Sequence, residues 1–186
     1  KKMTFLACFK AYDIRGKVPE DLDAELAYKI GRAYVAELGA KNVVVGYDIR
    51  LESESLAAAL KKGLTEAGAD VLDIGLCGTE EVYFATEHYK ADGGIMVTAS
   101  HNPKDYNGMK FVREGSRPIS GDTGLLDIKR LAEQNNFGES SAKGNIYPID
   151  TAEAYIGHLL SYVDPGSLKP LKIVVNAGNG GAGDVI

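Results

Sequence analysis

The residues best suited to chemistry lie in one polar segment near the middle of the chain, Val97-Thr-Ala-Ser-His-Asn-Pro103. This segment follows an apolar run that predicts a strand, so Ser100, His101 and Asn102 would lie in the loop after it. A serine hydroxyl is a weak nucleophile that needs a base, a metal or a preset electrostatic field. His101 and Lys110 are the nearby groups that can transfer a proton. The pattern suits a catalytic loop. However, adjacent side chains of an extended chain point apart, and a plain turn is the alternative.

A second feature is the tetrapeptide Tyr-Asp-Ile-Arg, which occurs at Tyr12–Arg15 and again at Tyr47–Arg50. One explanation is coincidence. The other is that Arg15 and Arg50 lie on loops after strands, where a guanidinium group binds both oxygens of a phosphate or carboxylate at once.

The glycine-rich segment near the end of the chain is a weaker candidate. Gly178, Gly180 and Gly183 fit the spacing of a dinucleotide-binding turn after a strand expected at Lys172–Asn176. The helix and the acidic residue that would support this interpretation lie beyond Ile186. With 22 glycines in the chain, chance matches are frequent. A dinucleotide-binding oxidoreductase using Gly178–Gly183 therefore stays open as an alternative.

The composition limits the class of protein and of partner. The chain has 186 residues, 45% of them hydrophobic and 25% charged, with 21 Lys and Arg against 26 Asp and Glu. A mildly acidic chain without a basic block is a poor candidate for binding nucleic acid or an anionic membrane. No apolar run reaches the roughly 20 residues that span a bilayer. With Cys8 and Cys77 as the only cysteines, a reduced, cytoplasmic setting is expected.

Hydrophobic periodicity and turn residues predict an alternation of strands and helices. Residues 1–10 predict a first strand rather than an export signal, because their apolar run is only seven residues long. The helices expected after it are Pro19–Gly39, one capped by Ser53, one capped by Thr79 and ending near Tyr89, and one starting near Asp122. The strands expected are Asn42–Gly46, Val71–Gly75, Gly94–Thr98 and Met109–Val112, the last preceded by a hairpin turn at Asn107-Gly108.

This alternation predicts an α/β fold, a three-layer α/β/α domain with a mixed, mostly parallel sheet. Ligands of such sheets gather at the carboxyl ends of the strands. Residues 134–148 are polar and predict a linker, and a short helix at Ala152–Val163 and a strand at Lys172–Asn176 follow. We therefore expect one domain over residues 1–148 and the truncated start of a second, similar domain over 149–186.

Several of these segments together resemble the α-D-phosphohexomutases. Thr98–Pro103, followed by Asn107–Phe111, resembles the phosphoserine loop of that family. Lys10–Gly16 and Gly46–Arg50 are similar to its two arginine segments. Residues 5–135 resemble the first domain, and those from about 149 the start of the second. Within the family, the particular sequence, including Gly78–Phe84, looks closest to the bacterial phosphomannomutases that serve the synthesis of GDP-sugars such as GDP-mannose.

The resemblance implies an isomerase that interconverts mannose 6-phosphate and mannose 1-phosphate. Ser100 would be the phosphoserine, which passes its phosphoryl group to the sugar and recovers another from the hexose 1,6-bisphosphate intermediate. His101 and Lys110 match the general acid and base, with their division of roles open. Arg15 matches the arginine near the phosphoserine, and Arg15, Arg50 and Asn102 are expected to bind substrate or phosphate.

The resemblance also implies a metal and an activator. The Ser100 phosphate would be one ligand of Mg²⁺, with the remaining ligands expected beyond Ile186, and hexose 1,6-bisphosphate would activate the enzyme. The family's metal loop, sugar-selecting loop and C-terminal phosphate loop are all missing from these 186 residues. The chain alone is therefore expected to lack appreciable turnover. A phosphoglucomutase, a phosphoglucosamine mutase or a non-catalytic binding module are the alternatives, and the oligomeric state is unknown.

Overall fold

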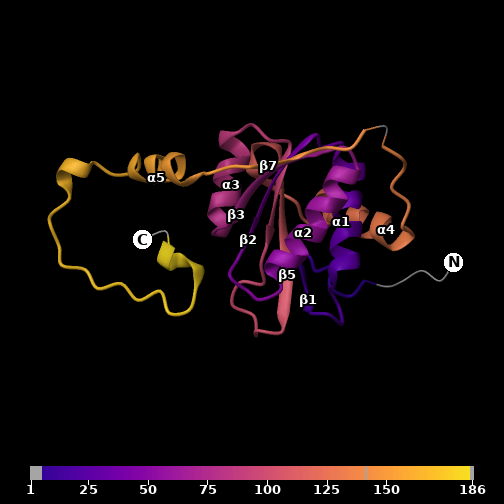
Figure 1. Cartoon of the computed structure of the whole chain (residues 1–186), viewed down its shortest axis with the longest axis horizontal. Helices are drawn as coiled ribbons and strands as arrows, with labels where there is room; N and C mark the ends of the chain where they lie inside the picture. The colour runs from indigo at the N-terminus through magenta and orange to yellow at the C-terminus, as the bar shows by residue number, and fades with distance from the viewer. Residues whose placement is uncertain (1–5, 141, 185–186) are drawn as a thin grey trace.

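The computed structural model describes residues 6–140 and 142–184, and a seven-stranded sheet forms its centre (Figure 1). The strand order is β1-β5-β4-β2-β3-β7, with β6 paired to β5. The strands are β1 (Ile14–Lys17), β2 (Asn42–Tyr47), β3 (Asp70–Leu76), β4 (Gly93–Val97), β5 (Tyr106–Arg113), β6 (Arg117–Pro118) and β7 (Ile146–Pro148). The helices are α1 (Ala24–Leu38), α2 (Ser53–Glu66), α3 (Thr79–His88), α4 (Leu125–Gln134) and α5 (Ala152–Leu160).

The sheet is mixed and mostly parallel, as predicted. Strands β4, β2, β3 and β7 pair in parallel, and β5 is antiparallel to its neighbours β1, β4 and β6. Since β5 alone runs the other way among these strands, the carboxyl ends of the others meet at one edge. That edge is where side chains after each strand can combine into a site.

Helices cover both faces of the sheet and give three layers (Figure 1). On β2, Val43 and Val45 join the larger buried cluster with α1, α2 and α4, whereas Val44 joins the smaller cluster with α3. Successive side chains of a strand point to opposite faces, so a continuous apolar run is needed when both faces are covered. The three-layer architecture expected from the sequence is confirmed.

Two strand predictions near the site are wrong in their detail. Asn107 and Gly108 lie inside β5, and residues 98–105 make the connection from β4 instead. Gly108 is enclosed there, because a Cβ atom would lie 2.0 Å from the carbonyl oxygen of Ile14 on β1. The first strand is also misplaced. Part of the predicted segment lies outside the described residues, and over the rest Phe9 makes only an isolated bridge to Ile14.

The helix starts predicted from Ser53 and Thr79 are each displaced by one residue. Glu52 and Gly78 are the N-cap residues, so Ser53 and Thr79 are the first helical positions. Helix α1 starts at Ala24 rather than near Pro19, because the Asp23 carboxylate accepts a hydrogen bond from the backbone N–H of Leu26. Because Ser53 is not the N-cap residue, its hydroxyl can form the hydrogen bonds of the site described below.

The final part of the chain differs from the prediction at two places. β7, inside the expected linker, adds to the sheet beside β3. Helix α5 contacts α3 through Phe84, whose ring centroid lies 5.4 Å from that of Tyr155 and 5.0 Å from that of His158. The strand predicted at Lys172–Asn176 is wrong, because that segment is exposed and unpaired among the described residues. Within the described chain, no helix is long and apolar enough to cross a membrane.

Candidate active site

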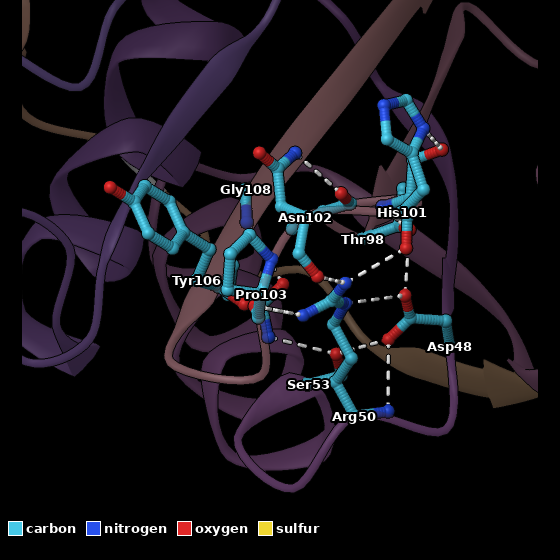
Figure 2. A network of polar contacts seen from close by, with 12 residues as sticks. Asp48, Arg50, Ser53, Thr98, His101, Asn102, Pro103, Tyr106 and Gly108 are labelled. Carbon is cyan, nitrogen blue, oxygen red and sulfur yellow. Dashed lines mark hydrogen bonds and ion pairs between the residues drawn. The ribbon is translucent and has the colours of Figure 1, made fainter. Parts of the chain in front are cut away.

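The candidate site lies where β2 and β4, neighbours in the sheet, end at the same edge. β4 leads into the loop of residues 98–105, and β2 leads into Asp48 and Arg50. Figure 2 shows the Asp48 and Arg50 side chains against this loop, with the His101 ring pointing away from both. The sequence segments Thr98–Pro103 and Gly46–Arg50 are therefore parts of one structure.

The Asp48 carboxylate begins a chain of hydrogen bonds that joins the end of β2 to the loop, to α2 and, through Ser53, to β5. Its Oδ2 accepts a hydrogen bond from Thr98 Oγ1 at 2.6 Å, and its Oδ1 accepts from Ser53 Oγ at 2.5 Å. Ser53 Oγ in turn accepts from Asn107 Nδ2 at 2.9 Å. Ser53 and Asn107 are fully buried, so each polar atom needs a partner within the protein. The chain of contacts fixes the start of the loop to β2, α2 and β5 together.

Arg50 holds the loop by its backbone. Its Nη1 donates to the carbonyl oxygens of Pro103 and Tyr106 at 2.8 and 3.0 Å. Its Nη2 donates to those of Ser100 and Asn102 at 2.8 and 2.5 Å. The guanidinium Nε lies 3.6 Å from Asp48 Oδ2. The terminal nitrogens of Arg50 thus serve the loop, and phosphate binding by Arg50 stays a prediction.

Ser100 has an unusual backbone conformation. Its φ is +54°, in the left-handed region that non-glycine residues rarely adopt, and its backbone N–H donates to Thr98 Oγ1 at 2.9 Å. The side chain is exposed, and Ser100 Oγ lies 3.2 Å from His101 Nδ1. The expectation that these neighbours point apart is wrong, because the chain turns at Ser100 instead of running extended. The hydroxyl is presented to solvent beside a group that can accept or donate its proton.

Asn102 stabilises the loop locally. Its backbone N–H and its Nδ2 both donate to the carbonyl oxygen of Ala99, at 3.0 and 2.8 Å. These bonds close the turn that contains Ser100 and His101. The predicted contact between Asn102 and substrate is not tested by this arrangement and stays a prediction.

Arg15 and Lys110 come together at a carboxylate. Asp13 Oδ2 lies 2.8 Å from Arg15 Nη2 and 3.6 Å from Lys110 Nζ. Arg15 is on β1 and Lys110 on β5, the strand that connects through the loop to β4. Among the described residues, no hydrogen bond or ion pair joins either cation to Ser100. The two predicted groups thus form a cationic pair beside the loop, and their contact with a phosphoryl group stays a prediction.

Sequence reasoning singled out the arginines of the repeated tetrapeptide and missed their aspartates. In both copies the residue two positions before the arginine pairs with it, as Asp13 with Arg15 and Asp48 with Arg50. The signal was the equal spacing of opposite charges in the two copies, since residues two apart in extended chain share a face. Ser53 was proposed only as a helix cap, and Asn107 only as a turn residue.

Metal binding through the Ser100 phosphate stays a prediction. Among the residues that the structure describes, no group of three or more His, Cys, Asp or Glu side chains could hold a metal ion. A divalent cation in a protein usually takes several carboxylate or carbonyl oxygens. The expectation that most Mg²⁺ ligands lie beyond Ile186 is not tested by this observation and stays a prediction.

The glycine-rich segment does not have the context of a dinucleotide site. Gly178 has a φ of +59°, and its N–H donates to Asn176 Oδ1, which makes a local turn. The strand that should precede such a turn is not formed at 172–176. The oxidoreductase alternative therefore loses the structural feature on which it depended.

Comparison with known proteins points to one family. Residues 7–139 match the model described as phosphoglucomutase/phosphomannomutase, alpha/beta/alpha domain I. Curated relatives named phosphomannomutase include one from Salmonella typhimurium strain LT2, 61% identical over 186 residues, and one from Escherichia coli strain K12, 58% identical over 186 residues. Each match covers 99% of this chain and 41% of the relative, so the chain spans about two fifths of their length.

A solved structure supports the same assignment. The crystal structure of a phosphoglucomutase/phosphomannomutase family protein from Burkholderia thailandensis matches with a TM-score of 0.78 at 36% identity. The match covers 86% of this chain and 36% of that one. Because the family model covers most of the chain and the fold agrees as well, this chain belongs to the phosphoglucomutase/phosphomannomutase family.

Proposed function

We propose that the intact protein containing this chain is a phosphomannomutase, which interconverts mannose 6-phosphate and mannose 1-phosphate. The observation that carries the proposal is the Ser100 hydroxyl, exposed on a loop whose backbone carbonyls are held by Arg50 and whose Thr98 side chain is held by Asp48. The names of the relatives at 61% and 58% identity favour mannose as the sugar. Hexose phosphates would be the partners, and the cytoplasm the setting.

The proposed reaction passes one phosphoryl group at a time. A hydroxyl of the hexose phosphate attacks the phosphorus of phosphorylated Ser100. The new O–P bond forms as the bond to Ser100 Oγ breaks. The attacking hydroxyl gives its proton to a base and the leaving Ser100 Oγ takes one from an acid, and His101 and Lys110 would fill these two roles, in either order. The resulting hexose 1,6-bisphosphate reorients and returns its other phosphoryl group to Ser100 Oγ. Phosphoryl transfer depends mainly on positioning and charge neutralisation, which suits an anchored loop beside cations.

The chain's own residues would supply part of that neutralisation. Arg15 and Lys110 would bind the transferred phosphoryl group, and Arg50 and Asn102 would bind phosphate or substrate in addition to closing the loop. A Mg²⁺ ion bound to the Ser100 phosphate, with its other ligands from outside residues 1–186, would supply further positive charge. Hexose 1,6-bisphosphate would act as the activator because it phosphorylates a bare Ser100.

The experiment that tests the proposal is phosphorylation mapping of the intact protein. After incubation with hexose 1,6-bisphosphate, mass spectrometry should place phosphate on the tryptic peptide Ala91–Lys104, at Ser100. Ser100→Ala should lose both the phosphate and mutase turnover. The matched control is Ser116→Ala, because Ser116 has the same φ of +54° but lies at the other end of β5, after Arg113. Unmodified Ser100 in an active enzyme would contradict the mechanism.

A second candidate is a phosphoglucomutase, since the family model and the solved Burkholderia relative are both described as phosphoglucomutase/phosphomannomutase. Competition between mannose 6-phosphate and glucose 6-phosphate on the intact protein distinguishes the two. A tenfold preference in kcat/KM for the mannose substrate would support the first proposal. The opposite preference would support the second, and a preference for a glucosamine phosphate would indicate a phosphoglucosamine mutase.

Residues 1–186 alone are expected to show no appreciable turnover. The chain covers 41% of the length of its relatives, and its described residues lack a complete metal site. A coupled assay with mannose 1-phosphate, activator and Mg²⁺ tests this directly. Robust turnover by residues 1–186 would show that the missing parts of the relatives are dispensable.

A further inference from the structure

We propose that Asp13 is a positioning residue for phosphoryl transfer, one carboxylate that sets the relative positions of Arg15 and Lys110. The inference deepens the proposed mutase function and rests on it. Asp13 Oδ2 lies 2.8 Å from Arg15 Nη2 and 3.6 Å from Lys110 Nζ. A single oxygen atom thus joins the two cations that the reaction is expected to use.

The register of the sheet makes this meeting point. Ile14 on β1 pairs with Met109 on β5 in an antiparallel ladder. Asp13 precedes Ile14 and Lys110 follows Met109, so continuing the register by one residue sets Asp13 directly opposite Lys110. Directly opposed side chains of antiparallel strands are close enough to pair. Arg15 lies two residues along β1 from Asp13 and therefore projects from the same face.

A tight hairpin fixes Asp13 at the start of β1. The Lys10 N–H donates to the carbonyl oxygen of Asp13 at 2.8 Å, and the Arg15 N–H donates to that of Cys8 at 2.7 Å. Cys8 is buried, which holds the returning chain against the core. Both backbone bonds restrict the main chain at Asp13, so the position from which its side chain extends is fixed.

The carboxylate of Asp13 is more buried than the two cations that it contacts. The Asp13 side chain is 13% exposed, whereas those of Arg15 and Lys110 are 35% and 32% exposed. The carboxylate is thus behind the cations, which keep donors toward solvent. Two cations and one carboxylate leave the cluster positive, as phosphate binding requires, while the carboxylate offsets their repulsion. The negative charge of Asp13 also reaches the Tyr83 hydroxyl on α3. Burial is the main cause that raises the pKa of Tyr83, and the charges of Glu80 and Asp13 raise it further.

This arrangement predicts separate effects on rate and on binding. Asp13→Asn keeps the side-chain shape but removes the charge, so the two cations would repel each other and move. Misplacement of such groups by about 1 Å lowers turnover by up to about 100-fold. The cluster would gain net positive charge, so phosphate binding should not weaken. We expect kcat to fall 10- to 100-fold and KM to stay the same or decrease.

The experiment compares Asp13→Asn, Asp13→Glu and the control Asp73→Asn in the intact protein with mannose 1-phosphate. Asp73 on β3 also forms a partly buried ion pair, with Lys61, but lies beyond β4 and β2 from β5. The Asp73→Asn variant therefore shows how much kcat changes when a similar ion pair is lost away from the site. Asp13→Glu restores the charge at a longer reach and should have a kcat between those of the wild type and Asp13→Asn.

A double-mutant cycle separates positioning from general destabilisation. If Asp13 acts through Lys110 as well as Arg15, Asp13→Asn should lower kcat by a smaller factor in the Lys110→Met background than in the wild type, because the part that acts through Lys110 is already lost. Multiplying effects would overturn the inference. So would a kcat for Asp13→Asn equal to that of Asp73→Asn, or a raised KM with unchanged kcat.

Two further outcomes are informative. If circular dichroism shows that Asp13→Asn does not fold, Asp13→Glu decides, since a wild-type kcat in that variant would overturn the inference and a reduced kcat at constant KM would support it. An intact wild-type protein without mutase activity would overturn the proposed function and this inference together. If the wild type is active and the Asp13 variants have its kcat, this inference alone would be overturned.

Discussion

The two copies of Tyr-Asp-Ile-Arg place the same pair of charges in different surroundings. In the second copy, Arg50 directs its terminal nitrogens to loop carbonyls, and Asp48 accepts from Thr98 and Ser53. In the first copy, Asp13 lies between Arg15 and a cation from another strand. The Asp48–Arg50 pair therefore builds the loop, and the Asp13–Arg15 pair lies in the cationic cluster beside it.

At the residue scale, Asp48→Asn should weaken the loop. The amide offers one oxygen where the carboxylate offers two, so either Thr98 Oγ1 or the buried Ser53 Oγ loses its acceptor. Leaving one such group without a partner costs about 1–3 kcal/mol. We expect the free energy of unfolding of residues 1–186, measured in urea, to fall by about that amount, and the rate of Ser100 phosphorylation in the intact protein to fall as well.

The control for Asp48→Asn is Glu54→Gln, in the first turn of α2, which removes an exposed carboxylate on the neighbouring helix. Its unfolding free energy should change by less than about 0.5 kcal/mol. Equal stabilities of Asp48→Asn and the wild type would show that the Asp48 contacts are energetically unimportant.

The backbone of Ser100 gives a second expectation at this scale. A φ of +54° costs a residue with a Cβ atom roughly 1–2 kcal/mol, and glycine avoids that cost but loses about 0.5–1 kcal/mol of backbone entropy on folding. Ser100→Gly should therefore be more stable than Ser100→Ala by about 0.5–1 kcal/mol in urea unfolding. A Ser100→Ala chain as stable as Ser100→Gly would contradict the left-handed conformation. Both variants should lack turnover in the intact protein.

At the element scale, two glycines determine how closely α1 and α2 approach. A Cβ atom at Gly63 would lie 2.1 Å from the carbonyl oxygen of Tyr28, and one at Gly31 would lie 2.5 Å from that of Leu60. Neither contact can be relieved by rotating a side chain, because the opposing atoms are backbone. The helices can pack this closely only because both positions lack side chains.

Gly63→Ala should consequently destabilise the chain, although alanine favours a helix more than glycine does by about 1 kcal/mol. Pushing the two helices apart should cost more, about 1–3 kcal/mol net. The matched control is Gly157→Ala in α5, where a Cβ atom meets nothing within 4 Å. Urea unfolding should show no loss of stability in the control. A loss of the same size in both variants would point to propensity or solvent effects instead of the helix contact.

The predicted elements succeeded where a local pattern was complete. The apolar stripe Leu26, Ile30 and Tyr34 of α1 is buried as expected, and Gly39 ends the helix with a φ of +63°. Asn107-Gly108 failed because the dipeptide signal for a hairpin turn was overridden by packing. Gly108 is needed where β1 approaches β5, and Asn107 bonds to Ser53 from within the strand. A two-residue turn signal carries no information on how closely a distant strand such as β1 packs against β5.

At the scale of the whole molecule, packing on the two faces of the sheet raises the pKa values of both cysteine thiols. Burial raises the pKa of Cys8 from 9.0 to about 11 and that of Cys77 from 9.0 to about 12. The unfolded chain, with pKa values near 9, loses these protons first as the pH rises. Stability contributed by the protonated thiols is therefore complete below about pH 9 and decreases as the pH rises toward 11 to 12.

We therefore expect the free energy of unfolding to decrease between pH 9 and pH 11, measured by urea titrations at constant ionic strength. A chain with Cys8→Ala and Cys77→Ala should show a shallower decrease over the same range, because it has no thiols to ionise. An identical pH dependence in the two chains would show that the cysteines do not contribute. Alkylation of either thiol should also be slow at pH 8 until urea unfolds the chain.

The sequence by itself determined the alternation of helices and strands, the three-layer class, and the loop that carries Ser100, His101 and Asn102. These follow from short-range causes, since periodicity, turn residues and a contiguous motif act within a few positions of the chain. Its resemblance to the phosphohexomutases also identified the family, which the comparisons then showed.

Only the tertiary structure decided how these parts meet. Strand order and register brought Asp48 and Arg50 beneath the loop, and set Asp13 opposite Lys110. The left-handed turn at Ser100 and the absence of a strand at 172–176 also emerged only there. The physical reason is common to all of them. Each depends on contacts between segments far apart in the chain, or on their absence, and no local pattern records which distant backbone will supply a hydrogen bond or an opposing charge.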